Sequence, residues 1–287
     1  MNVSSLLKAP GKTLSFEVFP PKTDAAFATV RLATELIAAL RPAYMSVTYG
    51  AGGSGSAATL QVAEHLIRDL KVPVVAHLTC VGASFASIDR QLAEMEQAGV
   101  ENILALRGDL PQGYDHQCAD FTHACDLIAY VRERVDWSIG GACYPEVHPE
   151  SACQREDLAS LRRKVEAGCD YLVSQMFFDN NIYYNFLYKA REAGIYVPIV
   201  PGIMPITRAS QIGRAVQLSG TNVPGRFRQI VDAFGQSPAA MEQAGIAYAT
   251  EQVVDLLANG VEHVHVYSMN KPQVARAILH NVQELLK

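Results

Sequence analysis

One acidic residue lies inside an apolar segment near the start of the chain. Glu17 stands between Phe16 and Val18 in FEVFPP, and the alternation of a β-strand places its side chain on the face opposite to theirs. A carboxyl group that points into the interior of a barrel loses hydration, which raises its pKa. We therefore predict that Glu17 stays protonated near neutral pH and acts as a general acid, with a paired structural carboxylate as the alternative.

Other polar residues follow short apolar runs. Asp109 comes directly after such a run in LALRGDLP, where Arg107 could simply be its ion-pair partner. The segment CYPEVHPES carries two prolines, which restrict the backbone around His148 and are typical of a loop that presents side chains. The remaining polar residues at the ends of apolar runs are Thr48, His77, Tyr144, Gln175, Asn270 and Lys271. If the runs are strands of one barrel, all these residues gather at its active-site end.

A glycine-rich segment, residues 50–55, matches the pattern G-x-G-x-x-G and follows a predicted strand. In a dinucleotide-binding fingerprint the segment follows the first strand, and an acidic residue ends the next one. Here it follows the second predicted strand, and Asp69, the acid that comes about 20 residues later, ends a helical segment. We interpret the segment as a loop whose bare backbone could approach a phosphate or a ring closely.

Two further clusters give weaker chemical signals. His263 and His265 share one face of the last predicted strand, but Glu262 points to the other face, so we expect no metal site. The basic residues 162–164 follow Asp157 on a predicted helix. On the sequence alone, a solvated helical face explains them.

The elements that must position these residues repeat along the chain as a short strand-like run, a polar turn and an amphipathic helical segment. The predicted strands are 14–19, 44–49, 73–79, 102–106, 138–144, 170–177, 197–201 and 262–267. The first seven begin 27 to 36 residues apart, close to the roughly 30 residues of a βα unit. The gap of 65 residues before the eighth leaves room for extra helices near 208–218, 224–235 and 239–259. We predict one domain, 1–287, folded as a single (β/α)8 TIM barrel, with a doubly wound open sheet as the alternative.

The composition argues against several classes of protein. Of 287 residues, 49 % are hydrophobic and 18 % charged, and 29 acidic against 24 basic residues leave a net charge of −5. This balance argues against a nucleic-acid or anionic-membrane partner, because either would require a basic face. No run approaches the ~20 apolar residues that span a bilayer, the amino-terminal segment lacks the apolar core of a signal peptide, and the six cysteines form no C-x-x-C pair. We expect a soluble, cytoplasmic protein with reduced thiols.

Seven segments, taken together and in order, resemble the signature segments of the methylenetetrahydrofolate reductase family. They are FEVFPPKT, SVTYGAGGS, AHLTC, LALRGDLP, CYPEVHPE, DYLVSQMFFD and PGIMPI. The resemblance extends from Phe16 to Lys271 and is closest to the bacterial form, which consists of the catalytic barrel alone. It implies a barrel with noncovalent FAD, and reduction of 5,10-methylenetetrahydrofolate to 5-methyltetrahydrofolate by NADH or NADPH. Electrons would pass through the flavin in a ping-pong sequence, and the chain would form a homo-oligomer.

The same resemblance implies roles for individual residues. Glu17 would be the general acid that helps open the folate ring, and Asp109 the carboxylate near flavin and folate. Gln175, Gln211 and Lys271 would contact the folate. The residues that would contact FAD are Thr48, Tyr49, His77, Arg107, Gly108, Asp109, Tyr144, His148, Asp157, Arg163 and Lys164. Arg163 and Lys164 would then be cations for a pyrophosphate rather than parts of a solvated face.

Two positions depart from the family pattern. Ala215 stands where close relatives carry an aromatic residue that stacks on the substrates, and such stacking is worth about 1 kcal/mol beyond buried area. Lys271 stands where relatives carry arginine, and lysine cannot form the forked contact with a carboxylate. Alternative functions are a flavin-free, folate-dependent methyl-handling transferase, a noncatalytic folate-binding protein and a proline-oxidising FAD barrel.

Overall fold

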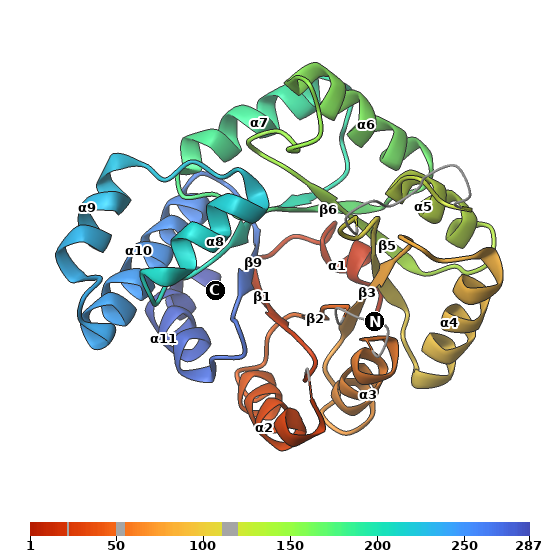
Figure 1. Cartoon of the computed structure of the whole chain (residues 1–287), viewed down its shortest axis with the longest axis horizontal. Coiled ribbons are helices and arrows are strands. Elements are labelled where there is room, and N and C mark those ends of the chain that lie inside the picture. Colours follow the sequence, from red (N-terminus) through yellow and green to blue (C-terminus); the bar gives the residue numbers. More distant parts are fainter. Residues whose placement is uncertain (22, 50–54, 111–119) are drawn as a thin grey trace.

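The computed structural model describes residues 1–21, 23–49, 55–110 and 120–287 (Figure 1). Nine parallel strands in this part of the chain wind into a barrel in the order β7-β6-β5-β4-β3-β2-β1-β9-β8. The strands are β1 (Thr13–Val18), β2 (Met45–Val47), β3 (Val74–Thr79), β4 (Asn102–Leu106), β5 (Ser138–Cys143), β6 (Tyr171–Ser174), β7 (Ile199–Val200), β8 (Gly202–Ile203) and β9 (His263–Tyr267). The predicted TIM barrel is confirmed.

Helices surround the barrel and follow the strands in alternation. They are α1 (Val3–Leu6), α2 (Phe27–Ala38), α3 (Gly55–Arg68), α4 (Phe85–Ala98), α5 (Ala124–Arg132), α6 (Gln154–Glu166), α7 (Asn180–Glu192), α8 (Ser210–Ser219), α9 (Gly225–Phe234), α10 (Pro238–Ala258) and α11 (Pro272–Val282). Short 3-10 helices cover Asp24–Ala26 and Gln283–Leu286. The three extra helices predicted before the last strand are α8, α9 and α10, and α9 projects from the ring of helices in Figure 1.

Local sequence signals explain where these helices begin and end. Ser84 caps the start of α4 by accepting the amide of Ser87, and the Ser87 hydroxyl group accepts the amide of Ser84 in return. Gly99 ends the same helix with a φ of +84°, a left-handed conformation that favours glycine. The helix therefore ends at Ala98, and three residues, 99–101, lead from it into β4.

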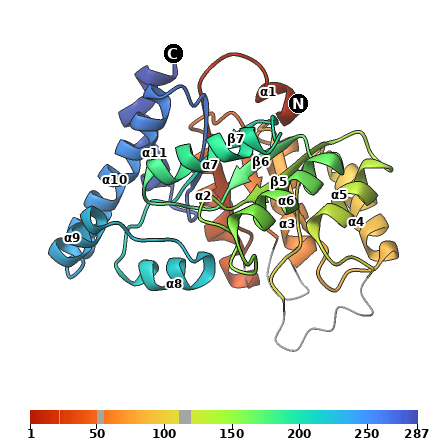
Figure 2. The same ribbon diagram turned by 90° about the horizontal axis from the view of Figure 1, so that it is seen from above.

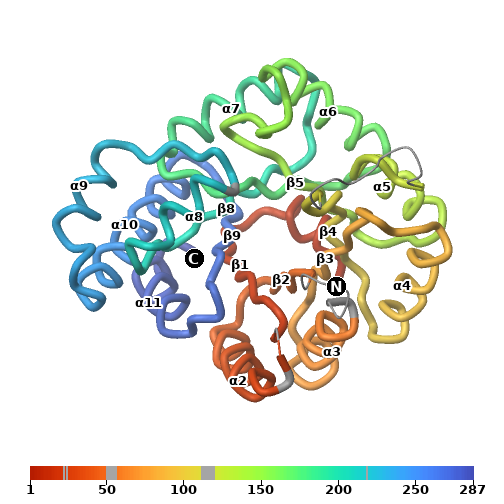
Figure 3. Tube along the Cα trace, viewed as in Figure 1, coloured from red at the N-terminus to blue at the C-terminus, as the bar shows by residue number. Residues whose placement is uncertain are grey.

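The seventh predicted strand, 197–201, contains β7, which pairs with β6, but a separate strand, β8, begins just after it and pairs with β9. Pro201 lies between the two strands and has no amide proton for a continuous ladder. Ser174 joins the two sides: its hydroxyl group accepts the amide of Gly202 at 2.9 Å, and its carbonyl accepts the Tyr267 hydroxyl at 2.6 Å. A Cβ at Gly202 would lie 2.4 Å from the Ser174 carbonyl, so this seam requires glycine. Figure 3 traces the adjacent course of β8 and β9.

Helix α1 covers the amino-terminal end of the barrel, at the opposite end from α8 (Figure 2). The amide of Val3 donates to the Asn102 side chain at 2.7 Å, and the amide of Ser4 donates to the Ser138 hydroxyl at 2.9 Å. A cluster of buried side chains fills the barrel interior next to this helix: Val3, Leu7, Tyr44, Val75, Leu104, Tyr171, Val173 and Val200. The barrel is thus closed at this end and accessible from the carboxyl ends of the strands.

None of the helices in the described ranges is long and apolar enough to cross a membrane. Residues 50–54 of the glycine-rich segment lie outside the described residues, as does Pro111 after Asp109.

Candidate active site

A cavity of about 570 Å³ lies at the carboxyl ends of the strands. The polar side chains that line it come from six strands or the turns that follow them, and from α8: Glu17, Ser46, His77, Tyr144, Ser174, Gln175, Gln211, Arg214, His265 and Tyr267. Four of the residues predicted from the sequence as polar strand-end groups, Glu17, His77, Tyr144 and Gln175, therefore meet in one hollow. This is the position at which TIM barrels carry their active sites.

Glu17 faces this cavity, as predicted, and its side chain is 20 % exposed. One carboxylate oxygen, Oε2, lies 3.3 Å from the Ser46 hydroxyl, 3.5 Å from His77 Nε2 and 3.8 Å from His265 Nε2. Burial acts to raise the pKa of Glu17, but the nearby imidazoles of His265 and His77 and the Ser46 hydroxyl outweigh it. The pKa is therefore lowered, and the prediction that Glu17 stays protonated near neutral pH is wrong.

His265 belongs to a chain of short polar contacts that ends at Glu17. Its Nδ1 lies 2.7 Å from the Ser15 hydroxyl, and its Nε2 lies 3.0 Å from the Ser46 hydroxyl. The neighbouring His263 is engaged elsewhere, with Nδ1 2.9 Å from the Thr13 hydroxyl and Nε2 3.1 Å from the carbonyl of Leu7. Among the described residues, no group of three or more histidine, cysteine, aspartate or glutamate side chains could hold a metal ion.

His77 and Tyr144 lie on the side of the cavity formed by β3 and β5. His77 is buried, and within the described ranges its Nε2 atom has no hydrogen-bond partner, although Glu17 lies 3.5 Å away. Burial lowers the pKa of His77 despite the attraction of Glu17, so the imidazole is neutral at pH 7. Burial raises the pKa of Tyr144, which packs edge-on against His148 with ring centroids 4.6 Å apart.

Arg107 does not pair with Asp109, the alternative that the sequence left open. Its guanidinium group instead donates two hydrogen bonds of 2.6 Å to the Glu150 carboxylate, which raises the pKa of Arg107. Asp109 is exposed and is not among the residues that line the cavity, although its charge contributes to the raised pKa of Tyr144. Between Arg107 and Asp109, Gly108 has a φ of +92°, and a Cβ there would lie 2.7 Å from Val81.

The cationic residues of α6 lie beside the loop that carries His148. Lys164 Nζ donates to the carbonyl of Ala142 at 2.8 Å, and exposed Arg163 donates to the Ser160 hydroxyl at 2.8 Å. Burial raises the pKa of Asp157, while the backbone of His148 and the charge of Lys164 act against that rise. Asp157 and Lys164 thus lie next to the cavity rather than in its lining, whereas Arg163 is exposed on α6.

The residues predicted to contact folate are divided between the cavity and its edge. Gln175 and Gln211 line the cavity, and the Gln211 side-chain oxygen also accepts the amides of Thr207 and Arg208 at 2.9 Å each. Lys271 is not among the lining residues and donates to the Thr207 hydroxyl. Its pKa is lowered by burial and by the nearby charge of Arg208.

Three further residues singled out from the sequence are Ala215 on α8 and Thr48 and Tyr49 after β2. Ala215 is buried and lines the cavity, with the exposed Arg214 beside it. Thr48 and Tyr49 are partly buried after β2, and the Thr48 carbonyl accepts the Thr59 hydroxyl at 2.9 Å. Neither Thr48 nor Tyr49 lines the cavity.

Sequence reasoning missed several residues that surround Glu17. Ser46 and Ser15 lie on β2 and β1 and connect Glu17 to His265, which the sequence marked only as a candidate metal ligand. Tyr44 and Tyr171 extend the cavity into the barrel interior. Strand alternation places Ser15 and Glu17 on one face, and this signal could have identified Ser15.

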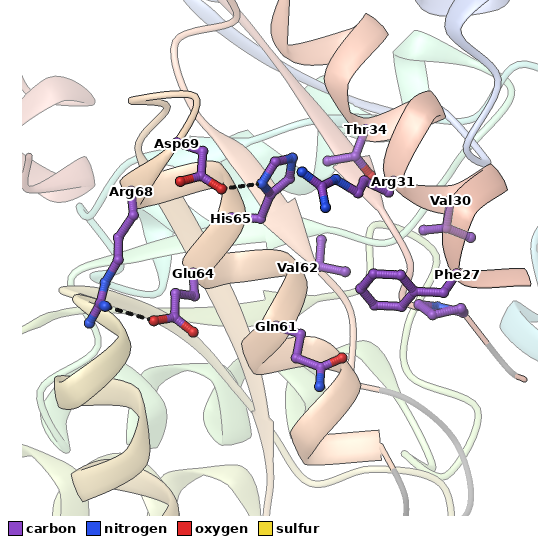
Figure 4. Close-up of a pocket in the computed structure, with 11 residues that line it drawn as sticks. Phe27, Val30, Arg31, Thr34, Gln61, Val62, Glu64, His65, Arg68 and Asp69 are labelled. Atoms are coloured by element: carbon purple, nitrogen blue, oxygen red, sulfur yellow. Dashed lines mark hydrogen bonds and ion pairs between the residues drawn. The ribbon is translucent and has the colours of Figure 1, made fainter. Parts of the chain in front are cut away.

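A second cavity, of about 420 Å³, lies on the outer wall between α2 and α3 (Figure 4). His65 contacts Asp69 at 2.6 Å there, and Arg68 pairs with Glu64 at 2.8 Å. It contains none of the predicted site residues.

Comparisons with known proteins identify what the chain is similar to. The sequence model described as "Methylenetetrahydrofolate reductase" matches residues 2–283. A curated relative from Escherichia coli (strain K12), "5,10-methylenetetrahydrofolate reductase", is 32 % identical over 97 % of this chain and 93 % of its own length. "Methylenetetrahydrofolate reductase (NADH) 1" from Zea mays is 35 % identical over 98 % of this chain. The chain spans about half the length of that plant relative, 50 %.

A solved structure has a similar fold over nearly the whole chain. It is an uncharacterised protein from Clostridium thermocellum whose description states that it binds two copies of 5-methyl-5,6,7,8-tetrahydrofolic acid. The TM-score is 0.66 at 15 % sequence identity, with 99 % of this chain and 98 % of the other covered. At this identity the likeness supports the barrel fold alone.

Proposed function

The chain belongs to the methylenetetrahydrofolate reductase family, and we propose that it reduces 5,10-methylenetetrahydrofolate to 5-methyltetrahydrofolate. The cofactor is noncovalent FAD, and the electron donor is NADH or NADPH. The observation that carries the proposal is the position of Glu17, which faces the strand-end cavity with Ser46 and two imidazoles around one carboxylate oxygen. The folate ligand in the description of the Clostridium thermocellum protein and the NADH in the name of the Zea mays relative support the choice of substrates.

The residues at the cavity fit a flavin dinucleotide. His77 offers a buried ring nitrogen with no hydrogen-bond partner in the described part of the chain, and it lines the cavity next to Glu17. Such a nitrogen can bond a polar edge of an isoalloxazine ring. The positive φ of Gly108 leaves bare backbone at the end of β4. The other residues that would hold FAD are Thr48, Tyr49, Arg107, Asp109, Tyr144, His148, Asp157, Arg163 and Lys164.

Bound FAD supplies two-electron chemistry, accepting electrons from the nicotinamide nucleotide and delivering them to the folate. This chain's own residues handle the proton that folate reduction consumes. Glu17 donates it to a ring nitrogen of the substrate, which opens the five-membered ring. The surroundings of Glu17 lower its pKa, and a substrate that excludes water from the cavity acts in the opposite direction and favours the neutral carboxyl group.

Folate recognition rests on the side-chain amides of Gln175 and Gln211 and on the cation of Lys271. Gln175 and Gln211 line the cavity, and their side-chain oxygens accept backbone amides of this chain, which leaves their NH₂ groups to donate to a pterin ring. Lys271 binds a carboxylate of the folate tail as a point charge rather than as a fork. Asp109 acts from the exposed loop after β4, near Tyr144, where its charge tunes the flavin and orients folate.

Anaerobic mixing of the purified protein with NADH, NADPH and 5-methyltetrahydrofolate, each alone, tests this function. We expect a yellow protein whose flavin absorbance is bleached by at least one nicotinamide nucleotide and by the methylated folate. A colourless protein that binds reduced folate without turnover would refute the proposal and favour the noncatalytic or methyl-handling alternatives. We also infer a cytoplasmic homo-oligomer from family resemblance, and light scattering coupled to size-exclusion chromatography measures its assembly.

A further inference from the structure

The floor of the main cavity contains two tyrosines that the reaction described above does not use. Tyr44 precedes β2 and Tyr171 begins β6, and both belong to the buried cluster inside the barrel. They line the same cavity as Glu17 although they are only 2 % and 0 % exposed. The Tyr171 ring lies against Gly140 of β5, where a Cβ would come within 2.5 Å of it. The cavity thus reaches from the strand ends into the barrel interior.

The hydroxyl groups of these two tyrosines differ from those of the buried Tyr183 and the partly buried Tyr267. Tyr183 donates its hydroxyl to the carbonyl of Ile199 at 2.7 Å, and Tyr267 donates to the carbonyl of Ser174 at 2.6 Å. In the part of the chain that the structure describes, neither the Tyr44 nor the Tyr171 hydroxyl has a hydrogen-bond partner. Buried polar atoms nearly always have a partner in the protein or in ordered water. Both hydroxyl groups border the main cavity, as does the unpartnered Nε2 atom of His77, so the cavity is where the partners of the two hydroxyl groups belong.

Tyr44, at the floor of the cavity, adjoins the series of polar contacts that links His265 to Glu17. The Tyr44 ring stacks on the imidazole of His265, with centroids 5.8 Å apart and planes 8° apart. Burial raises the pKa of Tyr44 to about 12, the Ser15 hydroxyl acts against that rise, and the charge of Glu17 adds to it. Both phenols therefore keep their protons at neutral pH and can donate hydrogen bonds. Ser15 in turn contacts His265 at 2.7 Å.

We propose that the hydroxyl groups of Tyr44 and Tyr171 bind ordered water at the floor of the cavity, and that this water returns to Glu17 the proton spent in each turnover. The water site stands on the geometry alone, whereas the proton supply rests on the proposed function. One proton leaves Glu17 for the folate nitrogen, and one proton passes from a water between the Tyr44 hydroxyl and Ser15 along Ser15, His265 and Ser46 to Glu17. The water recovers its proton from bulk solvent when the product leaves, and no electrons move.

Tyrosine-to-phenylalanine variants test the water site, because each removes a hydroxyl group and little else. Thermal unfolding of the FAD-loaded enzyme is compared for Tyr44→Phe, Tyr171→Phe and two reference variants. Tyr183→Phe removes a hydroxyl group with a protein partner, and Tyr196→Phe removes one from a side chain that is 75 % exposed. We expect both floor variants to lower the melting temperature as Tyr183→Phe does, while Tyr196→Phe leaves it unchanged. Unchanged or raised melting temperatures in the floor variants would show that their hydroxyl groups have no partner, which overturns the water site.

Rapid mixing in H₂O and in D₂O tests the proton supply. In Tyr44→Phe, the reduced enzyme should react with 5,10-methylenetetrahydrofolate about tenfold more slowly and with an altered solvent isotope effect, a smaller loss than the roughly 10²–10⁴-fold of a missing general acid. Flavin reduction by the nicotinamide nucleotide should keep its rate. A wild-type rate for the folate step, or an equal fall in both steps, would refute the proton supply. If the unmodified enzyme reduces no folate, the proposed function fails, and the melting comparison still decides the water site.

Discussion

Replacing Glu17 with glutamine separates the two halves of the proposed reaction. The variant keeps the side-chain volume and an oxygen that can accept the Ser46 hydroxyl, now 3.3 Å from the carboxylate, but it carries no ionisable proton. General acid catalysis contributes about 10²–10⁴-fold, so E17Q should slow folate reduction by that factor, equivalent to roughly 3–5 kcal/mol of transition-state stabilisation. Flavin reduction by NADH or NADPH requires no proton from Glu17 and should change by less than about threefold. Stopped-flow absorbance measures the two steps separately.

The lowered pKa of Glu17 adds a second measurement to the same variant. A carboxyl group whose pKa is lower in the folded chain than its ordinary value of 4.5 stabilises the fold above that value. This contribution is lost as the pH falls through the folded-state pKa, because the unfolded chain then binds more protons. The melting temperatures of wild type and E17Q should therefore differ most at neutral pH and converge in acid. Equal losses in both half-reactions, or a difference that widens in acid, would refute the assignment of Glu17 as an ionised carboxylate that acts as the acid.

Three further substitutions test other parts of the structure. Asn102→Ala removes the acceptor of the Val3 amide under the barrel and should lower the free energy of unfolding by about 1–3 kcal/mol, measured by urea denaturation. Ala215→Phe adds a ring to the cavity wall and should tighten binding of 5-methyltetrahydrofolate by about 1 kcal/mol, or roughly fivefold, in an equilibrium titration; an unchanged affinity would count against stacking at this position. Glu150→Gln breaks a half-exposed ion pair and should change stability by less than about 1 kcal/mol, while it frees Arg107 for the FAD pyrophosphate and strengthens FAD binding, measured by fluorescence quenching. Weaker FAD binding would instead place Glu150 among the groups that hold the cofactor.

The strand spacing predicted the barrel because each βα unit repeats the same length of chain and the same change from strand to helix period. The predicted strand 102–106 coincides with β4, and the three extra helices lie where the long gap left room for them. Helix α1 was not predicted, since four residues are too few to show a helical period. The separate strand β8 also escaped prediction, because it depends on which neighbours Ile199–Val200 and Gly202–Ile203 pair with.

The sequence likewise predicted only part of the candidate site. Strand alternation correctly predicted that Glu17 points into the barrel, but the predicted protonation state was wrong. Its pKa depends on Ser46, 29 residues away, and on His265 at the far end of the chain, neither of which the local sequence connects to Glu17. Tyr44 and Tyr171 look like ordinary core aromatics in the sequence, and only the cavity beside them distinguishes them.

The seam at Ser174 has a consequence for the mechanics of the barrel. Gln175 follows this residue on one side of the seam, whereas Gln211 follows β8 on the other side. Strands β7 and β8 have two residues each and stand at the two ends of the strand order, so among the described strands the ring has least backbone pairing at this join. A ligand held by both glutamines would cross-link the barrel there, and the same contacts that recognise the ligand would keep the ring from opening.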